Sequence, residues 1–236
     1  MRWLTANGCM MRVALISDIH ANLEALEAVL ADLPAVDRIV CCGDLVGYYD
    51  RPNEVCALVR DRGIACIRGN HDAYVTGALT PDAEKRPFYR TDWTRDVLAD
   101  AHLTWLEGLG TDLRFEDDLH RLWIRHASPW DEETYLYPDA AAAIARLEIE
   151  EGETLVVGHT HRPLHVGAGH GRLLNPGSVG QPRDWDPRAA YAVIDLATGA
   201  VDQRRVRYEV AAVQRRLAAS GWDPGITGLL GRSRTL

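Results

Sequence analysis

Residues 12–20 read RVALISDIH, an apolar run with β-branched side chains that ends on an aspartate and a histidine. An apolar run of this length, bounded by polar residues, predicts a buried strand over 12–17. Leucine and valine then recur at helical spacing over 21–33, which predicts a helix. Asp18 and His20 therefore fall in the turn that follows the carboxyl end of the strand.

The same order of elements continues along the chain. Residues 37–41 predict a second buried strand, Pro52 stands at the start of a second helix, and residues 64–67 predict a third strand. Strands that alternate with helices predict a parallel sheet with right-handed crossovers. Polar residues again follow the strand ends, namely Asp44 after the second strand and Asn70 and His71 after the third.

Later histidines occupy the same kind of position. His126 follows a strand predicted over 119–125, and His159 and His161 follow one predicted over 154–157. Because ligands bind outside the carboxyl ends of the strands in open α/β sheets, we expect all these side chains to share one site.

The side chains at these strand ends are two carboxylates, one amide and four imidazoles: Asp18, His20, Asp44, Asn70, His126, His159 and His161. They form a ligand set for two adjacent divalent metals, with His71 left over as a proton donor. Mixed nitrogen and oxygen shells suit manganese, iron, zinc, nickel or cobalt better than calcium or magnesium. Two metals in one hydrolytic site indicate phosphate-ester chemistry.

Each of these residues has an ordinary structural alternative. Asp18 could cap the helix that follows it, and Asp44 and Asn70 could shape turns. A single histidine is more often a surface or packing residue than a ligand, and motif matches arise freely by chance. The ordered succession of all of them at strand ends is what favours a common metal site.

Composition narrows the classes of function. The chain has 236 residues, 47% of them hydrophobic, and a net charge of −8. The acidic total argues against a nucleic-acid partner, and no apolar run reaches the ~20 residues of a membrane span. The five cysteines, an odd number without a Cys-x-x-Cys pair, predict reduced thiols in a cytoplasmic enzyme rather than a disulfide framework. The first residues lack the apolar segment of a secretory signal, and we expect Met11 to be the natural start.

The remainder of the chain predicts further helices and a second sheet. We expect helices over 73–118, laid on the sheet edge, and a helix over 138–147. A closing helix over 209–219 precedes a tail at 221–236 that we expect to be loosely held. Antiparallel strands of the second sheet are predicted over 163–166, 172–174, 191–196 and 201–208.

The motifs taken together resemble those of a known family. The order Asp-x-His, Gly-Asp, Gly-Asn-His-Asp, His, Gly-His-Thr-His is similar to that of the calcineurin-like metallophosphoesterase superfamily. The stretches SDIHANLEAL at 17–26 and NPGSVGQPR at 175–183 resemble its small prokaryotic phosphoesterase branch. The resemblance implies an α/β (α+β) fold, a two-sheet β-sandwich flanked by helices, with the dimetal site at the carboxyl ends of strands. We expect one such domain over 11–208, with a helix and tail at 209–236 packed on it.

The resemblance also implies a role for each site residue. Asp18, His20, Asp44 and His161 would hold the first metal. Asp44, Asn70, His126 and His159 would hold the second. His71 matches the proton donor of the family, which protonates the leaving oxygen or holds a phosphoryl oxygen.

The sequence departs from the family pattern at one position. In the protein-phosphatase branch an aspartate orients the catalytic histidine, and Gly47 stands at that position here. Asp72 and Asp50 are candidates to replace it. Arg183 and Arg68 are candidates to bind substrate phosphate, with surface salt bridges as the alternative, which we prefer for Arg68.

These observations predict a dimetal-dependent phosphodiesterase that acts on a small, nucleotide-like phosphorylated substrate. A phosphomonoesterase or phosphoprotein phosphatase, and a non-catalytic scaffold of the same fold, stay open as alternatives. We expect two manganese ions as cofactors, with iron, nickel, zinc or cobalt as alternatives. Tyr48, Tyr49, Trp130 and Tyr135 flank the motifs, where they could stack on a nucleobase or simply pack.

Overall fold

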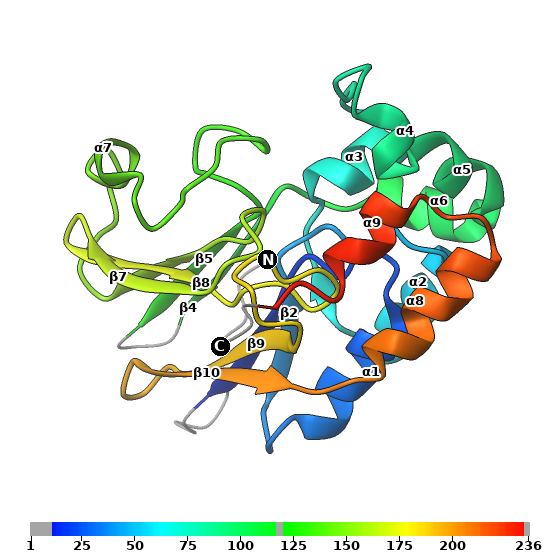
Figure 1. Ribbon diagram of the computed structural model, residues 1–236. Helices are drawn as coiled ribbons and strands as arrows, with labels where there is room; N and C mark the ends of the chain where they lie inside the picture. Colours follow the sequence, from blue (N-terminus) through cyan, green and yellow to red (C-terminus); the bar gives the residue numbers. More distant parts are fainter. Residues whose placement is uncertain (1–10, 117–119, 234–236) are drawn as a thin grey trace.

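Residues 11–116 and 120–233, which the computed structural model describes, form two five-stranded sheets that pack face to face. Figure 1 shows most of the helices gathered on one side of the strands, with a single short helix at the opposite end. The expected α/β sandwich flanked by helices is therefore confirmed. The predictions that concern residues 1–10 and Leu119 lie outside the described residues.

The first sheet has the strand order β10-β9-β1-β2-β3. Its strands are β1 (Arg12–Ile16), β2 (Arg38–Cys41), β3 (Ala65–Cys66), β9 (Ala189–Asp195) and β10 (Ala200–Val206). The strands β1, β2 and β3 are parallel, as the alternation of strands and helices predicts.

The assignment of residues 191–196 and 201–208 to the second sheet is wrong. They form β9 and β10, which join the first sheet because β9 runs antiparallel to β1, with Arg12 opposite Asp195. The side chains of β9 are buried on both faces of the sheet, a property that suits a central strand. The hairpin pattern predicted their pairing with each other but not the sheet they would join.

The second sheet has the order β4-β5-β6-β8-β7. Its strands are β4 (Asp112–Glu116), β5 (Arg121–Arg125), β6 (Glu153–Val156), β7 (Leu164–Ala168) and β8 (Gly171–Asn175). β5, β6 and β8 are parallel, whereas β4 and β7 are antiparallel edge strands. The expectation of helices throughout 73–118 missed β4, a short half-buried strand with only Phe115 fully turned inward.

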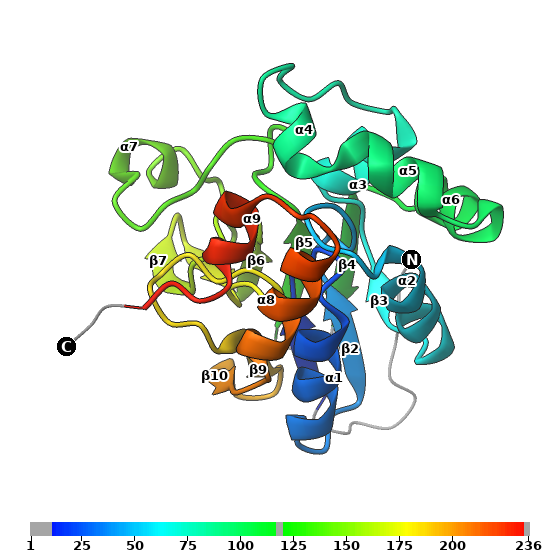
Figure 2. The same cartoon turned by 45° about the vertical axis from the view of Figure 1, so that its right-hand side comes forward.

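Nine helices are found in the described part of the chain. They are α1 (Leu23–Asp32), α2 (Pro52–Asp61), α3 (Asn70–Thr76), α4 (Arg86–Tyr89), α5 (Thr91–Val97), α6 (Asp100–Glu107), α7 (Ala141–Ile144), α8 (Val210–Ala219) and α9 (Pro224–Leu229). The helix expected over 138–147 is reduced to the single turn of α7. Figure 2 shows α8 lying alongside α1.

Two apolar layers follow from the alternation of side chains along β1. Val13 and Leu15 point into the layer between the two sheets, where they meet residues such as Ile124 and Val156. Ala14 and Ile16 point to the other face, which α1, α2 and α6 cover. The run at 12–16 is apolar throughout because both faces of this strand are buried.

One local alternative and one local expectation are not confirmed. The cap of α1 is Asn22, whose side chain accepts the N–H of Ala25 at 3.3 Å, so Asp18 is not the capping residue. The tail expected to be loosely held contains α9, and Ile226, Leu229 and Leu230 are buried against the domain. No helix of the described residues is long and apolar enough to cross a membrane.

Candidate metal centre

The carboxyl ends of the parallel strands in both sheets bring the expected polar residues together. Asp18 and His20 follow β1, Asp44 follows β2, and Asn70 opens α3 just after β3. From the second sheet, His126 follows β5, and His159 and His161 follow β6. The site is thus built half from each sheet, at the edge where the strands of both sheets end.

The donor atoms form two buried groups among the described residues, each within 4.8 Å. One group is Asp18, His20, Asp44 and His161; the other is Asp44, His126 and His159. Asp44 belongs to both. The amide oxygen of Asn70 lies 2.9 Å from His126 Nε2 and 2.9 Å from His159 Nδ1, which places it in the second group.

The backbone at these residues is strained. Five of the donor residues have φ in the left-handed region: Asp18 at 53°, His20 at 51°, Asp44 at 58°, His159 at 63° and His161 at 58°. This region is sparsely populated by non-glycine residues, and it persists only where the surroundings hold it. Such strain clusters at functional sites, where it aims side chains that regular structure could not.

The imidazole rings are held in fixed orientations by backbone carbonyls. The Nδ1 atoms of His20, His126 and His161 lie 3.2, 2.8 and 2.6 Å from the carbonyl oxygens of Val46, Cys42 and Gln181. In each case Nε2 is left facing the donor group. His159 is reversed, because its Nε2 lies 3.0 Å from the Glu133 carbonyl and its Nδ1 faces the group. Such bonds fix the tautomer in which a histidine can bind a metal.

Unsatisfied polar atoms test whether these residues fit metal ions. Asp18 Oδ2 and Asp44 Oδ2 are buried and have no hydrogen-bond partner within 11–116 and 120–233. The Nδ1 atoms of His20 and His161 both face carbonyl oxygens, so both carry the ring proton. The two Nε2 atoms, 3.1 Å apart, therefore have no proton with which to hydrogen-bond each other. Buried carboxylate oxygens without a hydrogen-bond partner are costly, and a bound cation would remove that cost. The residues therefore fit a pair of divalent ions with mixed nitrogen and oxygen ligands.

The pKa values of these groups follow from burial and from the two carboxylates. Burial lowers the pKa of His20 to about 4 and that of His159 to about 3, so both rings are neutral and able to bind metal. Burial opposes the charged form of His126 as well, but the neighbouring Asp44 carboxylate raises the pKa of this histidine to about 10. Burial raises the pKa of Asp18 to about 7.

His71 lies beside the donor groups at the first turn of α3. Its backbone N–H donates to Asp44 Oδ1 at 2.8 Å, so the position of His71 is fixed relative to the shared carboxylate. The two carboxylates considered as partners for its ring do not take that role. Asp50 pairs with Arg216, and Asp72 accepts backbone N–H groups. No hydrogen bond to the ring nitrogens of His71 is found in the described part of the chain.

Asp72 has a different function in the site. Its carboxylate accepts the backbone N–H groups of Asp44, Leu45, Val46 and Gly69 at 2.9 to 3.1 Å. It thereby ties the turn after β2 to the start of α3. The sequence signal for this role is an acidic residue in the first turn of a helix whose N-cap is a glycine.

The two candidate arginines differ in their surroundings. Arg68 makes a bidentate pair with Glu132, with Nε and Nη2 each 3.0 Å from a carboxylate oxygen, which is the salt-bridge alternative. Arg183 is half-buried and donates to Gln181 Oε1 at 2.8 and 3.1 Å and to the Tyr48 hydroxyl at 3.1 Å. It has no ion pair with a carboxylate among the described residues. Its positive charge contributes to lowering the pKa values of His20 and His161.

Comparisons with known proteins agree with this geometry. A family model described as the calcineurin-like phosphoesterase superfamily domain matches residues 11–199. An uncharacterized protein of Methanocaldococcus jannaschii is 34% identical over 226 residues, covering 87% of this chain and 91% of its own. The crystal structure of a metallophosphoesterase from Sphaerobacter thermophilus is 33% identical, with a TM-score of 0.78, and the match covers 95% of this chain and 99% of that one. A hypothetical protein from Pyrococcus horikoshii has the same fold, with a TM-score of 0.78 at 21% identity over 95% of this chain and 100% of its own.

Proposed function

This chain belongs to the calcineurin-like phosphoesterase superfamily, and from that we propose that it is a dimetal-dependent phosphodiesterase of small, nucleotide-like substrates. The observation that carries the proposal is the Asp44 carboxylate. It is shared by two buried donor groups, and its Oδ2 atom faces His126 and His20 but has no hydrogen-bond partner among the described residues. One carboxylate shared by two donor groups can bring two metal ions close together, as two-metal hydrolysis needs.

We assign the metal ligands from the two donor groups. Asp18, His20, Asp44 and His161 would hold one ion, and Asp44, Asn70, His126 and His159 would hold the other. When bound, two divalent ions supply Lewis acidity toward the phosphoryl oxygens and lower the pKa of a water molecule. We propose manganese as the native metal, with iron, nickel, zinc or cobalt as alternatives that the same donor set accepts.

His71 is our candidate for the group that acts on the leaving oxygen. Its backbone bond to Asp44 holds it next to the metal ligands. Burial lowers its pKa well below the ordinary value for histidine, so we expect a neutral ring that donates an N–H hydrogen bond rather than an imidazolium. A donor positioned in this way stabilises the charge that develops on the leaving oxygen.

Arg183 is our candidate for a phosphate-binding residue. A half-buried guanidinium that lacks a carboxylate partner is suited to an anionic ligand, and its charge persists at any working pH. We do not propose Arg68 for this role, because its guanidinium pairs with Glu132.

The substrate class rests on the aromatic surface at the site. Tyr135 is 40% exposed, and its ring centroid lies 4.0 Å from that of the proposed ligand His159. Tyr137 stacks on Tyr135 at 5.2 Å with an interplanar angle of 6°. We propose that a nucleobase packs against the exposed part of this aromatic pair next to the phosphoester site.

Two further properties belong to the proposal. The thiols of Cys41, Cys42, Cys56 and Cys66 are free, which supports the expectation of a cytoplasmic protein. Gly47 leaves no room for the carboxylate that orients the catalytic histidine in the protein-phosphatase branch. This argues for small-molecule diesters over phosphoproteins.

The test is hydrolysis by metal-stripped protein to which manganese, nickel, cobalt, zinc or magnesium is added singly. Bis(p-nitrophenyl) phosphate and p-nitrophenyl phosphate are the substrates, and His71→Ala is the control. We expect metal-dependent turnover of the diester that the variant loses. Turnover of the monoester alone would replace the proposal with a phosphatase. Binding of two ions without turnover of either ester would indicate a non-catalytic scaffold.

A further inference from the structure

The ring of His71 rests on the backbone of Gly47. A Cβ atom placed on Gly47 would lie 2.9 Å from His71 Nδ1 and 3.4 Å from its Cβ and Cγ, closer than packing allows. The glycine has φ of +88°, which side chains rarely adopt. A residue with a side chain at position 47, an aspartate included, would therefore displace the imidazole of His71.

Aromatic rings surround His71 where a carboxylate would otherwise orient it. The ring of Tyr48 lies 4.7 Å from that of His71 at 32°, and the ring of Tyr89 lies 4.5 Å away at 67°. His20 and Tyr74 complete the enclosure at 4.8 and 5.6 Å. Rings at these distances limit rotation of the imidazole by contact rather than by a hydrogen bond.

Tyr48, the ring nearest to parallel with His71, is held at three points. Its N–H donates to the carbonyl of Tyr89 at 2.9 Å, and its hydroxyl accepts from Arg183 at 3.1 Å. Its carbonyl accepts the indole N–H of Trp222 at 2.7 Å. Tyr48 has φ of +60°, a conformation that needs such support in a residue with a large side chain.

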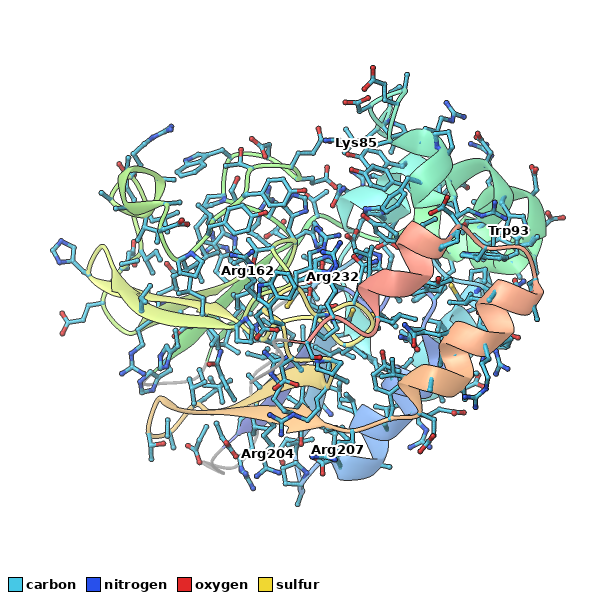
Figure 3. The ribbon with its side chains drawn as sticks, in the orientation of Figure 1. Lys85, Trp93, Arg162, Arg204, Arg207 and Arg232 are labelled. Atoms are coloured by element: carbon cyan, nitrogen blue, oxygen red, sulfur yellow. The ribbon has the colours of Figure 1, made fainter. Side chains whose placement is uncertain are left out.

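Trp222 belongs to what we call the C-terminal segment, residues 209–230, which includes α8 and α9. The indole is 7% exposed and packs edge-on against Trp93 at 4.7 Å, with the guanidinium of Arg90 4.3 Å over its ring. Figure 3 labels Trp93 on the side of the molecule where α5 meets the connection between α8 and α9. These contacts help to hold the indole in the position from which it donates to Tyr48.

A second contact holds the C-terminal segment to the same loop. Arg216 of α8 pairs with Asp50, which follows Tyr48 and Tyr49, and also with Glu24 of α1. Val213, Leu217, Ile226, Leu229 and Leu230 pack in one apolar cluster with Tyr48 and Tyr49. The C-terminal segment thus contacts both the backbone and the side chains of the loop after β2.

We propose that Tyr48 positions the imidazole of His71 and that Trp222, through its hydrogen bond to the Tyr48 carbonyl, positions Tyr48. The C-terminal segment lies beyond residues 11–199, which the family model matches, and it would thereby become part of the catalytic apparatus. The effect on rate rests on the proposed function. The effect on the position of His71 does not.

The test compares Trp222→Phe with the matched control Trp93→Phe. Both replace an indole of the same apolar cluster by a smaller ring, and phenylalanine at position 93 still gives Trp222 an aromatic neighbour, but only Trp222 donates to Tyr48. The position of His71 is read from the ring ¹³C–¹H resonance of histidine-labelled protein, which is assigned by its loss in His71→Gln. We expect the rings of Tyr48 and Tyr89 to shift this resonance in the wild type. We expect it to move or split in Trp222→Phe and to stay in place in Trp93→Phe.

Hydrolysis supplies a readout that a general loss of stability would not move. His71 is proposed to assist the leaving oxygen, so misplacing it should matter most for esters with poor leaving groups. We expect kcat of Trp222→Phe to fall roughly 10-fold to 100-fold for diphenyl phosphate and less than about 3-fold for bis(p-nitrophenyl) phosphate. Bound metal should stay unchanged.

A second pair of variants decides the matter if Trp222→Phe does not fold. Tyr48→Phe keeps the ring and loses the hydroxyl, whereas Tyr48→Leu loses the ring. We expect the His71 resonance to move in Tyr48→Leu and to hold in Tyr48→Phe. An unmoved resonance in both Trp222→Phe and Tyr48→Leu, or equal changes in Trp93→Phe, would overturn the inference. If the wild type hydrolyses no ester, the proposed function fails, and the resonance still decides whether Trp222 positions His71.

Discussion

The carboxylate of Asp72 lies 2.9 Å from the backbone nitrogen of Asp44 and accepts its N–H. Asp44 in turn accepts the N–H of His71 at 2.8 Å, so the bonds run both ways between the turn after β2 and the start of α3. Asp72 makes no hydrogen bond to the ring of His71 within the described residues, yet it holds the backbone of the residue that both proposed metals would share. It is a residue of the scaffold on which the site depends.

Replacing Asp72 by asparagine should destabilise the protein strongly. The amide would turn an N–H donor toward backbone groups whose N–H bonds the carboxylate now accepts, at a fully buried position. We expect a loss of about 3–5 kcal/mol in the free energy of unfolding, because several charged hydrogen bonds are weakened together. Urea denaturation measures it. Asp186→Asn, at a more exposed carboxylate paired with Arg188, should cost about 1 kcal/mol or less, and an equal cost would contradict this interpretation.

Asp44→Asn should separate metal binding from folding. The amide oxygen can still accept the N–H of His71, so we expect the fold to be kept. With one shared carboxylate lost, bound metal should fall below two ions per chain and diester hydrolysis should fall at least about 100-fold. Elemental analysis and steady-state kinetics on the same sample check both. Asp61→Asn, an exposed site on α2, should change neither, and full activity in Asp44→Asn at matched metal content would refute the ligand assignment.

Gly47→Ala should reduce both stability and activity. The new Cβ meets His71 Nδ1 at 2.9 Å on a backbone with φ of +88°, so steric overlap adds to conformational strain. We expect about 2–4 kcal/mol of destabilisation, or a drop of roughly 4–16 °C in Tm, and a lower kcat. Gly63→Ala is the matched control, because Gly63 also has positive φ, at +60°, but its Cβ would meet nothing within 4 Å. Equal effects in the two variants would show that contact with His71 contributes nothing.

Metal binding should release protons. In the metal-free protein the pKa of His126 is raised to about 10 and that of Asp18 to about 7, so near pH 7 His126 is protonated and Asp18 partly so. Both must lose their protons to act as ligands. Between pH 6 and 8 we therefore expect manganese affinity to rise about tenfold or somewhat more per pH unit. Titration calorimetry at pH 7 in two buffers of different ionisation enthalpy should give one to two protons released. Heats independent of the buffer would contradict these protonation states.

The features that could be predicted from the sequence are those that depend on residues close together in the chain. A buried strand that ends on Asp18 and His20 can be read from nine consecutive residues, and the same holds for Asp44 and Asn70. The parallel core of the first sheet follows from the alternation of strands and helices. These features depend on short-range patterns, and the structure brings those side chains to one edge.

The missed features depend on contacts between distant segments. Tyr89 and Trp222 stand in no motif, and their relation to His71 arises only when α4 and the C-terminal segment pack against the loop after β2. The membership of β9 in the first sheet was missed for a similar reason. A hairpin pattern is the same in either sheet, and the choice depends on which sheet has a free edge beside β1.

The pairing of β1 with β9 also determines when, during synthesis, the first sheet can form completely. Arg12 lies near the start of the described chain and pairs with Asp195, which a ribosome releases only after most of the chain has been made. Until β9 has been synthesised, β1 can pair with β2 on one side only, and its other edge is open. His159 and His161, which follow β6, are also made late in synthesis. Pairings between such distant segments are slow to form. Synthesis of this protein therefore passes through a long period in which an apolar strand edge is exposed, when shielding by chaperones matters most.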